Sequence, residues 1–501
     1  MVQYLTVSTR APYAIGVDIG TTNTKVVAVA GVQVLASFSA PTPSDGKALS
    51  GTVLTLVRRA VQACPGRPAA VGIASMAETG LPLDHRGVPL APLVRWQDAA
   101  GAAEAADALA RSLGRDELFE ATGVRVGPKA PLVVWLTLRR SGGLGHLAHW
   151  AGAADFAHLT LTGRLRTDHT LAGRTMAYRL PDPGEPLTPG FDAALLAEAG
   201  LTPDQLPHVG LPGESLDTVT RAAASETGLP EGTPVLVAGH DHQVGAWAAG
   251  VRRVGEVADS IGTAEAVLTL VGESEVRRPL AAEGFSLVRA IDGATEAVLA
   301  GSPSSGAFLQ WCADRWAGGD VAGFLAGTAG AARTLLARDS FLLPYPAGRQ
   351  CPAPDAAAHV RRISGGAFAP LEATGGVPYA VAAIEAVCYQ AQWMLDRQRE
   401  LARVPEGARG RLTVLGEPIR ANALWQGVKA TLAGGRATLV TEEQPVAVGA
   451  ALLALVRSGA VEDDAAIPSS GLRPIPTLAG AYRGGLDAFK AAATASRQAR
   501  S

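Results

Sequence analysis

Several features that would identify a class of protein are missing from this chain. Its four cysteines, Cys64, Cys312, Cys351 and Cys388, are scattered and form no C-x-x-C pair. This spacing favours neither a disulfide framework nor a zinc site, and it is typical of a reducing compartment. No block of basic residues occurs, and the formal net charge is −2. Nucleic acid is therefore a poor candidate partner.

Long apolar runs and sequence repeats are absent as well. No run of about 18 apolar residues occurs, so no membrane span is expected. The first ten residues lack a basic segment followed by an apolar one, and no signal peptide is expected there. No repeat of about 20–50 residues recurs, which argues against a solenoid or a propeller. These absences predict a cytoplasmic protein without a membrane partner; its oligomeric state stays open, with a homodimer as one option.

What the chain does have is length and ample core material. Its 501 residues, 48% of them hydrophobic, suffice for two or three domains. Apolar runs predict three strands over 13–40, a helix over 49–63 and a buried strand over 69–75, which is the start of a mixed α/β layer. A second layer begins near Val251 with a hairpin over 256–271. Further helices are expected over 99–111, 131–140, 243–250, 304–316, 377–403, 423–433, 446–457 and 482–497, and further strands over 234–238, 297–299 and 411–415.

The most informative motif is a polar turn between the first two predicted strands, Asp18-Ile19-Gly20-Thr21-Thr22-Asn23-Thr24-Lys25. Gly20 lets a ligand approach the backbone closely. The threonines and Asn23 offer hydroxyl, amide and backbone N–H groups to phosphate oxygens. Asp18 is a candidate Mg²⁺ ligand, directly or through water. The alternative interpretation is an ordinary hairpin with a polar turn, in which Lys25 is a surface lysine and not a phosphate contact.

A second turn repeats this pattern of acid, glycine and threonine. It reads Asp259-Ser260-Ile261-Gly262-Thr263-Ala264 and again precedes a strand-like run. Two such turns suggest two halves of similar build that face one nucleotide.

The motifs taken together resemble those of the FGGY carbohydrate kinases, within the larger group that shares the actin-type ATPase fold. The resemblance covers about residues 13–490. It rests on the order of five motifs more than on any one of them. These are the two turns just described, Gly239-His240-Asp241-His242, the run from Leu343 to Gly348, and the run from Val448 to Ala454.

The resemblance implies an α/β fold with two actin-like (ribonuclease H-like) domains and an interdomain cleft. Residues 12–250 would bind the sugar and supply the catalytic base, and residues 251–490 would bind the nucleotide. The implied activity is transfer of the γ-phosphoryl group of ATP, with Mg²⁺, to a hydroxyl of a small sugar or polyol. The family's phosphate-binding loops correspond to Gly20–Thr22 and to Gly262 and Thr263.

The family's catalytic aspartate corresponds to Asp241, which follows a predicted strand and precedes a predicted helix. Its proposed role is to accept the proton of the attacking hydroxyl, and it is also a candidate metal ligand beside Asp18. The alternative is a helix N-cap that only satisfies backbone N–H groups. His240 and His242 either contact the substrate or pack against a hinge.

The sugar would lie against the loop after the strand over 69–75, where the family places sugar contacts. Ser75, Met76 and Glu78 are the candidates there, although Glu78 could be a solvated carboxylate. Trp96 could stack on a sugar face or belong to the core, and Asp98 could bind hydroxyls. Glycerol kinases carry Arg-Glu-Thr and xylulokinases Met-His-Gly in this loop. Because Ala77 and Glu78 match neither, a ketose of four to six carbons or its polyol is preferred over glycerol.

The nucleotide loop departs from the family pattern, since only Gly416 remains of the usual glycines. Asn422 is placed to make a neighbouring polar contact, and the turn with Ser305 is placed to flank the nucleotide. Two other hypotheses stay open, a glycerol-kinase-like polyol kinase and a non-catalytic protein that binds sugar or nucleotide.

Overall fold

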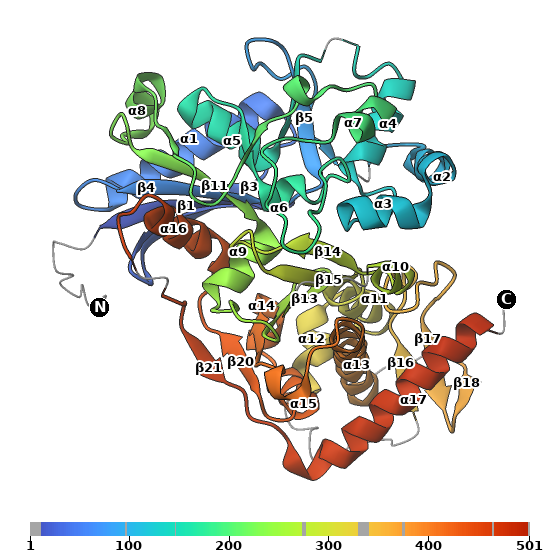
Figure 1. Cartoon of the computed structure of the whole chain (residues 1–501). Coiled ribbons are helices and arrows are strands. Elements are labelled where there is room, and N and C mark those ends of the chain that lie inside the picture. Colours follow the sequence, from blue (N-terminus) through green and yellow to red (C-terminus); the bar gives the residue numbers. More distant parts are fainter. Residues whose placement is uncertain are drawn as a thin grey trace. The chain divides into compact units, whose positions relative to one another are not determined.

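The computed structural model describes residues 12–95, 98–145, 147–272, 277–328, 340–372, 376–462 and 465–498. The chain divides into two compact units (Figure 1). Unit 1 takes its described residues from 1–250, 289–294 and 444–467, and unit 2 takes them from 251–288, 295–443 and 468–501. The segments 289–294 and 444–467, which the sequence analysis counted with the C-terminal domain, thus pack in unit 1.

A mixed six-stranded sheet forms the centre of unit 1, in the order β10-β11-β4-β1-β2-β3. The first three strands form the antiparallel meander that the sequence predicts, and β4 and β11 run parallel to β1. The strands are β1 (Tyr13–Ile19), β2 (Asn23–Ala30), β3 (Gln33–Pro41), β4 (Ala70–Ser75), β10 (Asp217–Thr218) and β11 (Pro234–His240).

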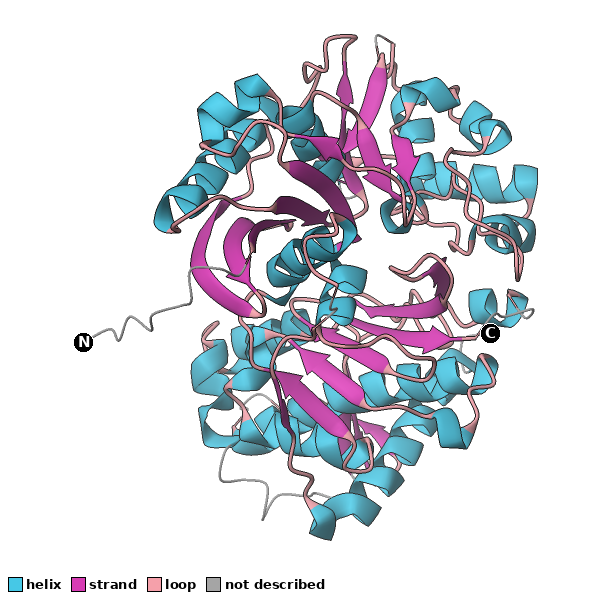
Figure 2. Ribbon diagram, turned by 60° about the vertical axis from the view of Figure 1, so that its left-hand side comes forward, coloured by secondary structure: helices cyan, strands magenta, loops and turns pink. Residues whose placement is uncertain are grey.

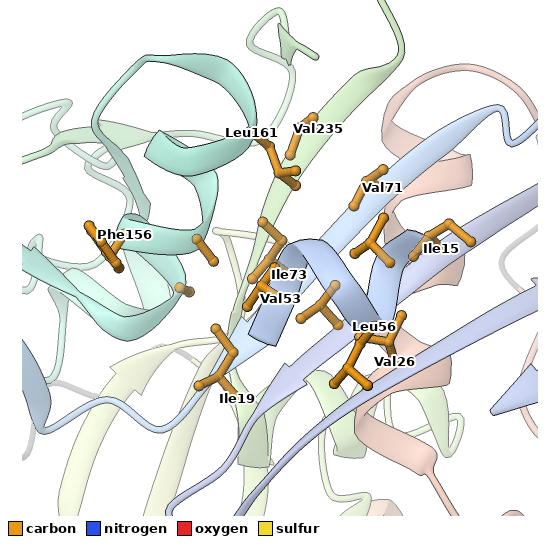
Figure 3. Close-up of a cluster of buried hydrophobic side chains, with 14 of the residues drawn as sticks. Ile15, Ile19, Val26, Val53, Leu56, Val71, Ile73, Phe156, Leu161 and Val235 are labelled. Atoms are coloured by element: carbon orange, nitrogen blue, oxygen red, sulfur yellow. The ribbon is translucent and has the colours of Figure 1, made fainter. Parts of the chain in front are cut away.

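Helices cover both faces of this sheet. On one face, α1 (Gly46–Ala63) and α5 (Ala153–Thr162) close a core in which Val53 and Leu56 meet strand residues such as Ile15 and Ile73 (Figure 3). On the other face lies α16 (Pro445–Arg457), which contacts β1, β2, β4 and β11. Fully buried β-branched and leucine side chains supply most of the favourable burial.

Glycines in two strands let α16 lie directly on the sheet. A Cβ at Gly16 would stand 1.8 Å from the carbonyl oxygen of Ala447, and one at Gly72 would stand 1.9 Å from that of Ala450. Both atoms are backbone atoms, so no side-chain rotation would relieve the overlap. The absence of two side chains therefore sets how closely helix and sheet approach.

The remaining elements of unit 1 pack around the central sheet and its helices. They include a three-stranded sheet, β6-β5-β7, and a pair, β8-β9. These elements are β5 (Thr79–Leu83), β6 (Val94–Arg95), β7 (His149–Gly152), β8 (Arg166–Asp168), β9 (His208–Gly210), α2 (Ala102–Leu113), α3 (Arg115–Thr122), α4 (Pro131–Arg140), α6 (His169–Ala172), α7 (Ala193–Glu198), α8 (Arg221–Thr227) and α9 (Asp241–Ala248).

Unit 2 is also built on a mixed sheet flanked by helices (Figure 2). The order of its seven strands is β14-β15-β13-β12-β19-β20-β21, and a small sheet β16-β17-β18 stands apart. The strands are β12 (Val257–Ile261), β13 (Glu265–Val271), β14 (Ser286–Arg289), β15 (Glu296–Ser302), β16 (Ser340–Leu343), β17 (Arg361–Ser364), β18 (Ala367–Ala369), β19 (Leu412–Leu415), β20 (Ala437–Val440) and β21 (Ser469–Gly471). The helices are α10 (Arg278–Ala282), α11 (Gly306–Trp316), α12 (Val321–Leu325), α13 (Val377–Leu401), α14 (Glu417–Arg420), α15 (Ala423–Leu432) and α17 (Ala479–Gln498).

Two expectations drawn from absent features can be compared with this fold. The four cysteines form no disulfide, in keeping with their spacing, and all four are buried. Within the described ranges, no helix is long and apolar enough to cross a membrane.

Candidate active site

Three parallel strands of unit 1 end at the same edge of the sheet and carry the polar residues that the sequence singles out. In the register, Ser75 of β4 stands beside Ile19 of β1 on one side and beside His240 of β11 on the other. Asp18 precedes Ile19 and Asp241 follows His240. Since neighbouring strands lie about 4.8 Å apart, β1 and β11 are separated by roughly 10 Å at this edge.

Both aspartates at this edge have raised pKa values. Asp18 is 8% exposed, and burial, followed by the nearby charge of Asp241, raises its pKa from 3.8 to about 7, while Lys25 acts in the opposite direction. Burial also raises the pKa of Asp241; Glu78 adds to this shift, whereas His242 and Arg174 oppose it. The two carboxylates offer hard oxygen donors, the kind of ligand that suits Mg²⁺.

Asp241 is the first residue of α9 and not the residue that caps it, which is His240. Its Oδ1 accepts a hydrogen bond from the adjacent backbone N–H of His242 at 2.6 Å and lies 3.2 Å from Nε2 of His240. An N-cap side chain instead bonds the N–H groups two or three residues further on. The carboxylate is 24% exposed, so it stays accessible to a ligand.

The two histidines lie around this carboxylate in different environments. His240 is 4% exposed, its Nδ1 has no hydrogen-bond partner among the described residues, and burial holds its pKa well below the usual 6.5. It is therefore neutral. His242 is partly buried, and its ring meets that of His240 edge to face at 5.2 Å. Donor atoms of both histidines and of Asp241 lie within 4.8 Å of one another.

Glu78 is paired and partly buried, unlike a solvated loop carboxylate. Its Oε1 accepts a hydrogen bond from Nη2 of Arg174 at 3.1 Å, and the two side chains are 23% and 18% exposed. Nε and Nη1 of Arg174 are buried and have no partner in the described part of the chain. Because buried donors are nearly always satisfied, these two N–H groups are candidate contacts for a ligand.

A pocket opens beside this pair. Counting the part open to solvent, its empty space is about 500 Å³. Its lining includes Ser75, Met76 and Glu78 together with Trp135 and Trp150. The Ser75 hydroxyl is tied to the protein itself, since it donates to the carbonyl of Met76 and accepts from the N–H of Ala154. The pocket thus combines apolar walls with few polar groups, as small-molecule sites do.

Two predicted sugar contacts come from the segment around residue 96. Asp98 pairs with Arg95 at 2.9 Å, both side chains are about half exposed, and this hydrogen bond lowers the pKa of Asp98. Trp96 lies outside the described residues.

The first glycine-threonine turn joins β1 to β2. The N–H of Gly20 donates to the carbonyl of Asn23, and the carbonyl of Gly20 accepts from the hydroxyl of Thr42. Thr21 and Thr22 are exposed, and Asn23 and Lys25 are half-buried. The backbone of Gly20 therefore holds the turn together. The Thr21 hydroxyl donates weakly to Sδ of Met76 at 3.4 Å, and both threonines remain exposed to a ligand.

The second turn, in unit 2, is also closed by a hydrogen bond from its glycine, over one residue fewer. Gly262 donates its N–H to the carbonyl of Ala264, and Thr263 is exposed. The N-terminus of α11 packs against this turn, since Gly306 N–H and Ala307 N–H donate to the carbonyls of Gly262 and Thr263. Ser305 precedes α11; its Oγ is buried and has no partner among the described residues.

Gly416 and Asn422 flank α14 in unit 2. Gly416 has φ +133°, and a Cβ there would stand 2.1 Å from the carbonyl oxygen of Ile261, next to the second turn. Gly416 therefore permits a close approach of backbone to backbone. Asn422 caps α15: its Oδ1 accepts from Trp425 N–H, and its Nδ2 donates to the hydroxyl of Thr328. Both ends of this amide are already engaged within the protein.

Three residues near the sheet edge were not singled out from the sequence, namely Asp168, Thr170 and Arg174. All three come from the segment around α6, and their contacts bridge long separations, 96 residues for Arg174 and Glu78 and 70 residues for His240 and Thr170. An acid followed by threonine and arginine is too common a pattern to have identified them without homologous sequences.

Comparisons with known proteins show which sequences this chain resembles. Residues 13–248 match the model of the N-terminal domain of the FGGY family of carbohydrate kinases. The chain is 23% identical to the gluconokinase of Bacillus subtilis (strain 168) over 323 residues, which cover 62% of this chain and 61% of that protein. It is 35% identical to the autoinducer-2 kinase of Enterobacter sp. (strain 638) over 148 residues, which cover 29% of this chain and 27% of that protein.

The fold is that of solved sugar kinases. The gluconate kinase from Lactobacillus acidophilus superposes with a TM-score of 0.82 at 20% identity, covering 97% of this chain and 98% of that one. The mixed α/β architecture expected from the sequence is therefore confirmed. Residues 13–248, just under half of the chain, thus resemble the N-terminal domain of the FGGY family of carbohydrate kinases in sequence, and the chain shares its fold with solved sugar kinases.

Proposed function

We propose that this protein transfers the γ-phosphoryl group of ATP to a hydroxyl of a small sugar or polyol, with Asp241 as the general base. The main support is the sheet edge of unit 1, where Asp18, the loop with Glu78, and Asp241 end three adjacent strands. The match of residues 13–248 to the N-terminal domain of FGGY carbohydrate kinases supports the class of reaction, and the site supports the assignment of roles.

Asp241 has the properties that proton acceptance requires. Phosphoryl transfer depends mainly on alignment and charge neutralisation, with a carboxylate to take the hydroxyl proton as the oxygen attacks phosphorus. A raised pKa makes this carboxylate a stronger base, and its partial exposure leaves room for the substrate. The neutral His240 beside it neither competes as a cation nor supplies a proton.

The two glycine-threonine turns are proposed to contact the phosphates, through Thr21 and Thr22 in unit 1 and Thr263 in unit 2. Gly262, Gly416 and Ser305 would shape the nucleotide site, and Asn422 would support it through the start of α15. Asp18 and Asp241 would hold Mg²⁺, which neutralises charge on the phosphates when bound. Lys25, opposite Asp18 in the β1–β2 register, would balance the charge of Asp18.

The substrate is proposed to lie beside Glu78 and Arg174. A carboxylate that accepts from sugar hydroxyls and a guanidinium with two unpartnered N–H groups together offer acceptors and donors to a polyhydroxylated molecule. A ketose of four to six carbons or its polyol stays the preferred class. Gluconate and autoinducer-2 belong among the candidates because they appear in the names of the relatives.

The reaction class is tested by ADP release with Mg²⁺-ATP and a panel of ketoses, polyols, glycerol, gluconate and autoinducer-2. Release that depends on one acceptor is the expected result. Acceptor-independent release would point to a nucleotide-dependent switch. Stabilisation by a sugar without turnover would point to a sensor, and either result would contradict the proposal.

The base assignment is tested with Asp241→Asn, which keeps the shape of the side chain but removes its basicity. We expect kcat to fall by about 10²–10⁴-fold, the usual contribution of a positioned base. Nucleotide binding, followed by titration with a fluorescent ATP analogue, should stay within a few-fold of the wild type. Wild-type turnover in this variant would refute the role of Asp241.

A further inference from the structure

We propose that Thr170 and Asp168 are positioning residues that fix the backbone from which Asp241 projects. This inference rests on the proposed function, because it gives Asp241 its role. It adds two residues that touch neither substrate nor nucleotide in that proposal and that act only through the strand–helix junction at His240.

A short chain of buried hydrogen bonds carries the inference. The backbone N–H of His240 donates to Oγ1 of Thr170 at 2.9 Å. The Thr170 hydroxyl in turn donates to Oδ1 of Asp168 at 2.6 Å, and that oxygen also accepts the N–H of Thr170 at 2.8 Å. Asp168 and Thr170 are each 1% exposed. In such a dry setting a misdirected donor has no water to replace its partner.

The junction between β11 and α9 needs this support because its backbone departs from regular strand geometry. The β11–β4 register shifts between Val237 and Gly239, and Gly239 has φ +125°. A Cβ at Gly239 would stand 2.4 Å from Oγ1 of Thr170 and 2.8 Å from Oδ1 of Asp168. Gly239 thus lets β11 approach the Thr170 hydroxyl closely. The hydroxyl accepts a hydrogen bond from the N–H of the next residue, His240.

Asp168 is held in its charged form from the far side. Its Oδ2 lies 3.3 Å from Nδ1 of His169 and 3.6 Å from Nη1 of Arg457. His169 is anchored through Nε2 to the carbonyl of Ala290 at 2.8 Å, and Arg457 donates to the carbonyl of Ile291 at 2.7 Å. The segment 289–294 and α16 therefore buttress the acid that orients Thr170.

The chain offers a closely matched control for this test. Thr227 in α8 is also fully buried, and its hydroxyl likewise accepts one backbone N–H, from Leu229 at 3.2 Å, and donates once, to the carbonyl of Ala223 at 2.7 Å. Thr170→Val and Thr227→Val should therefore lower stability to a similar extent. Only the first should change how Asp241 is held.

We expect Thr170→Val to lower kcat by about 10- to 100-fold, the range that small misplacements in an active site produce, with the KM for ATP nearly unchanged. Thr170→Ser, which keeps the hydroxyl, should recover most of kcat, and Thr227→Val should leave it unchanged. Should Thr170→Val not fold, Thr170→Ala replaces it, because it removes the hydroxyl without adding a methyl group.

A double variant separates positioning from general damage. If Thr170 acts through Asp241, Thr170→Val should cost nothing further in an Asp241→Asn background. Amide hydrogen exchange at His240 should quicken in Thr170→Val and not in Thr227→Val. Equal kcat losses in the two valine variants, or additive losses in the double variant, would overturn the inference. A wild type that phosphorylates no acceptor would instead end the proposed function, while the exchange measurement would still test the hydrogen bond.

Discussion

Among single residues, Glu385 of α13 is an ionisable group that forms no ion pair within the described part of the chain. It is 6% exposed, and its Oε1 has no hydrogen-bond partner among the described residues. Burial raises its pKa from 4.5 to about 8. It interacts electrostatically with Tyr389 of its own helix and Tyr482 of α17. Both tyrosine side chains are neutral at working pH, because burial raises their pKa values as well.

Glu385→Gln should therefore stabilise the protein at high pH only. Between the unfolded and folded pKa values the folded state binds more protons, so wild-type stability falls as pH rises from about 4.5 to about 8. The variant does not lose stability in this way. At pH 9 its free energy of unfolding should exceed that of the wild type by up to about 5 kcal/mol, at about 1.4 kcal/mol per pKa unit. Thermal midpoints at pH 5 and pH 9 measure the difference. Glu226→Gln, at an exposed carboxylate paired with Arg58, serves as the control for the same change of residue at the surface.

Glu78 gives a second prediction for a single side chain. Glu78→Gln should raise the KM for the accepted sugar by about 10- to 100-fold, because a hydrogen bond to a charged group contributes about 1.5–3 kcal/mol. The KM for ATP should change little. Glu214→Gln, which breaks the comparable pair with Arg166 at 2.6 Å, is the matched control for the loss of an Arg–Glu pair. Equal changes in both KM values would remove Glu78 from the sugar site.

The position of a single residue can be predicted from the sequence when it depends on neighbouring residues, and not when it depends on contacts distant in the chain. Asp18, Glu78 and Asp241 follow strands that are apolar and easily predicted, so their place at one sheet edge could be foreseen, although their roles stay predictions. Arg174 and Thr170 could not be foreseen, since their contacts lie 96 and 70 residues away. The close contact of Gly416 could not be predicted from a motif either, because its neighbour is the backbone of Ile261 in another strand.

At the scale of elements, the packing of α16 on β1 and β4 makes a prediction about stability. Gly72→Ala would place a Cβ 1.9 Å from the carbonyl oxygen of Ala450, so the helix must move. We expect a loss of about 1–3 kcal/mol or more, the usual cost of overpacking a core. Gly51→Ala, at an open position within α1, is the control and should be neutral or stabilising. A normal thermal midpoint for Gly72→Ala would show that α16 shifts at little cost.

Elements with a strong and continuous pattern follow the sequence closely. The helix expected over 131–140 is α4 with the same bounds, and the one over 377–403 is α13 (Val377–Leu401). The expected strand over 69–75 is β4 (Ala70–Ser75). By contrast, β5, β7, β8 and α6 were not foreseen. They are short, and strand pairing with distant partners determines them more than their own periodicity does.

For the molecule as a whole, unit 1 is assembled from segments far apart in the chain. A protein ending at residue 250 would lack α16 and expose the apolar face of the β1–β4 sheet. We expect it to unfold without a cooperative transition and to bind a hydrophobic dye. Joining residues 444–467 to it through a flexible linker should restore a cooperative transition. A sharp thermal transition in the shorter protein would contradict the structural importance of α16.

The late position of α16 also has a consequence for synthesis in the cell. The sheet of unit 1 leaves the ribosome long before the helix that covers its second face, because residues 251–443 must be translated in between. At about 5–20 residues per second, this interval lasts on the order of 10–40 s. During that time the nascent chain presents an uncovered β-sheet, which is the kind of surface that chaperones bind. The N-terminal half of this protein should therefore depend on chaperones until translation is nearly complete.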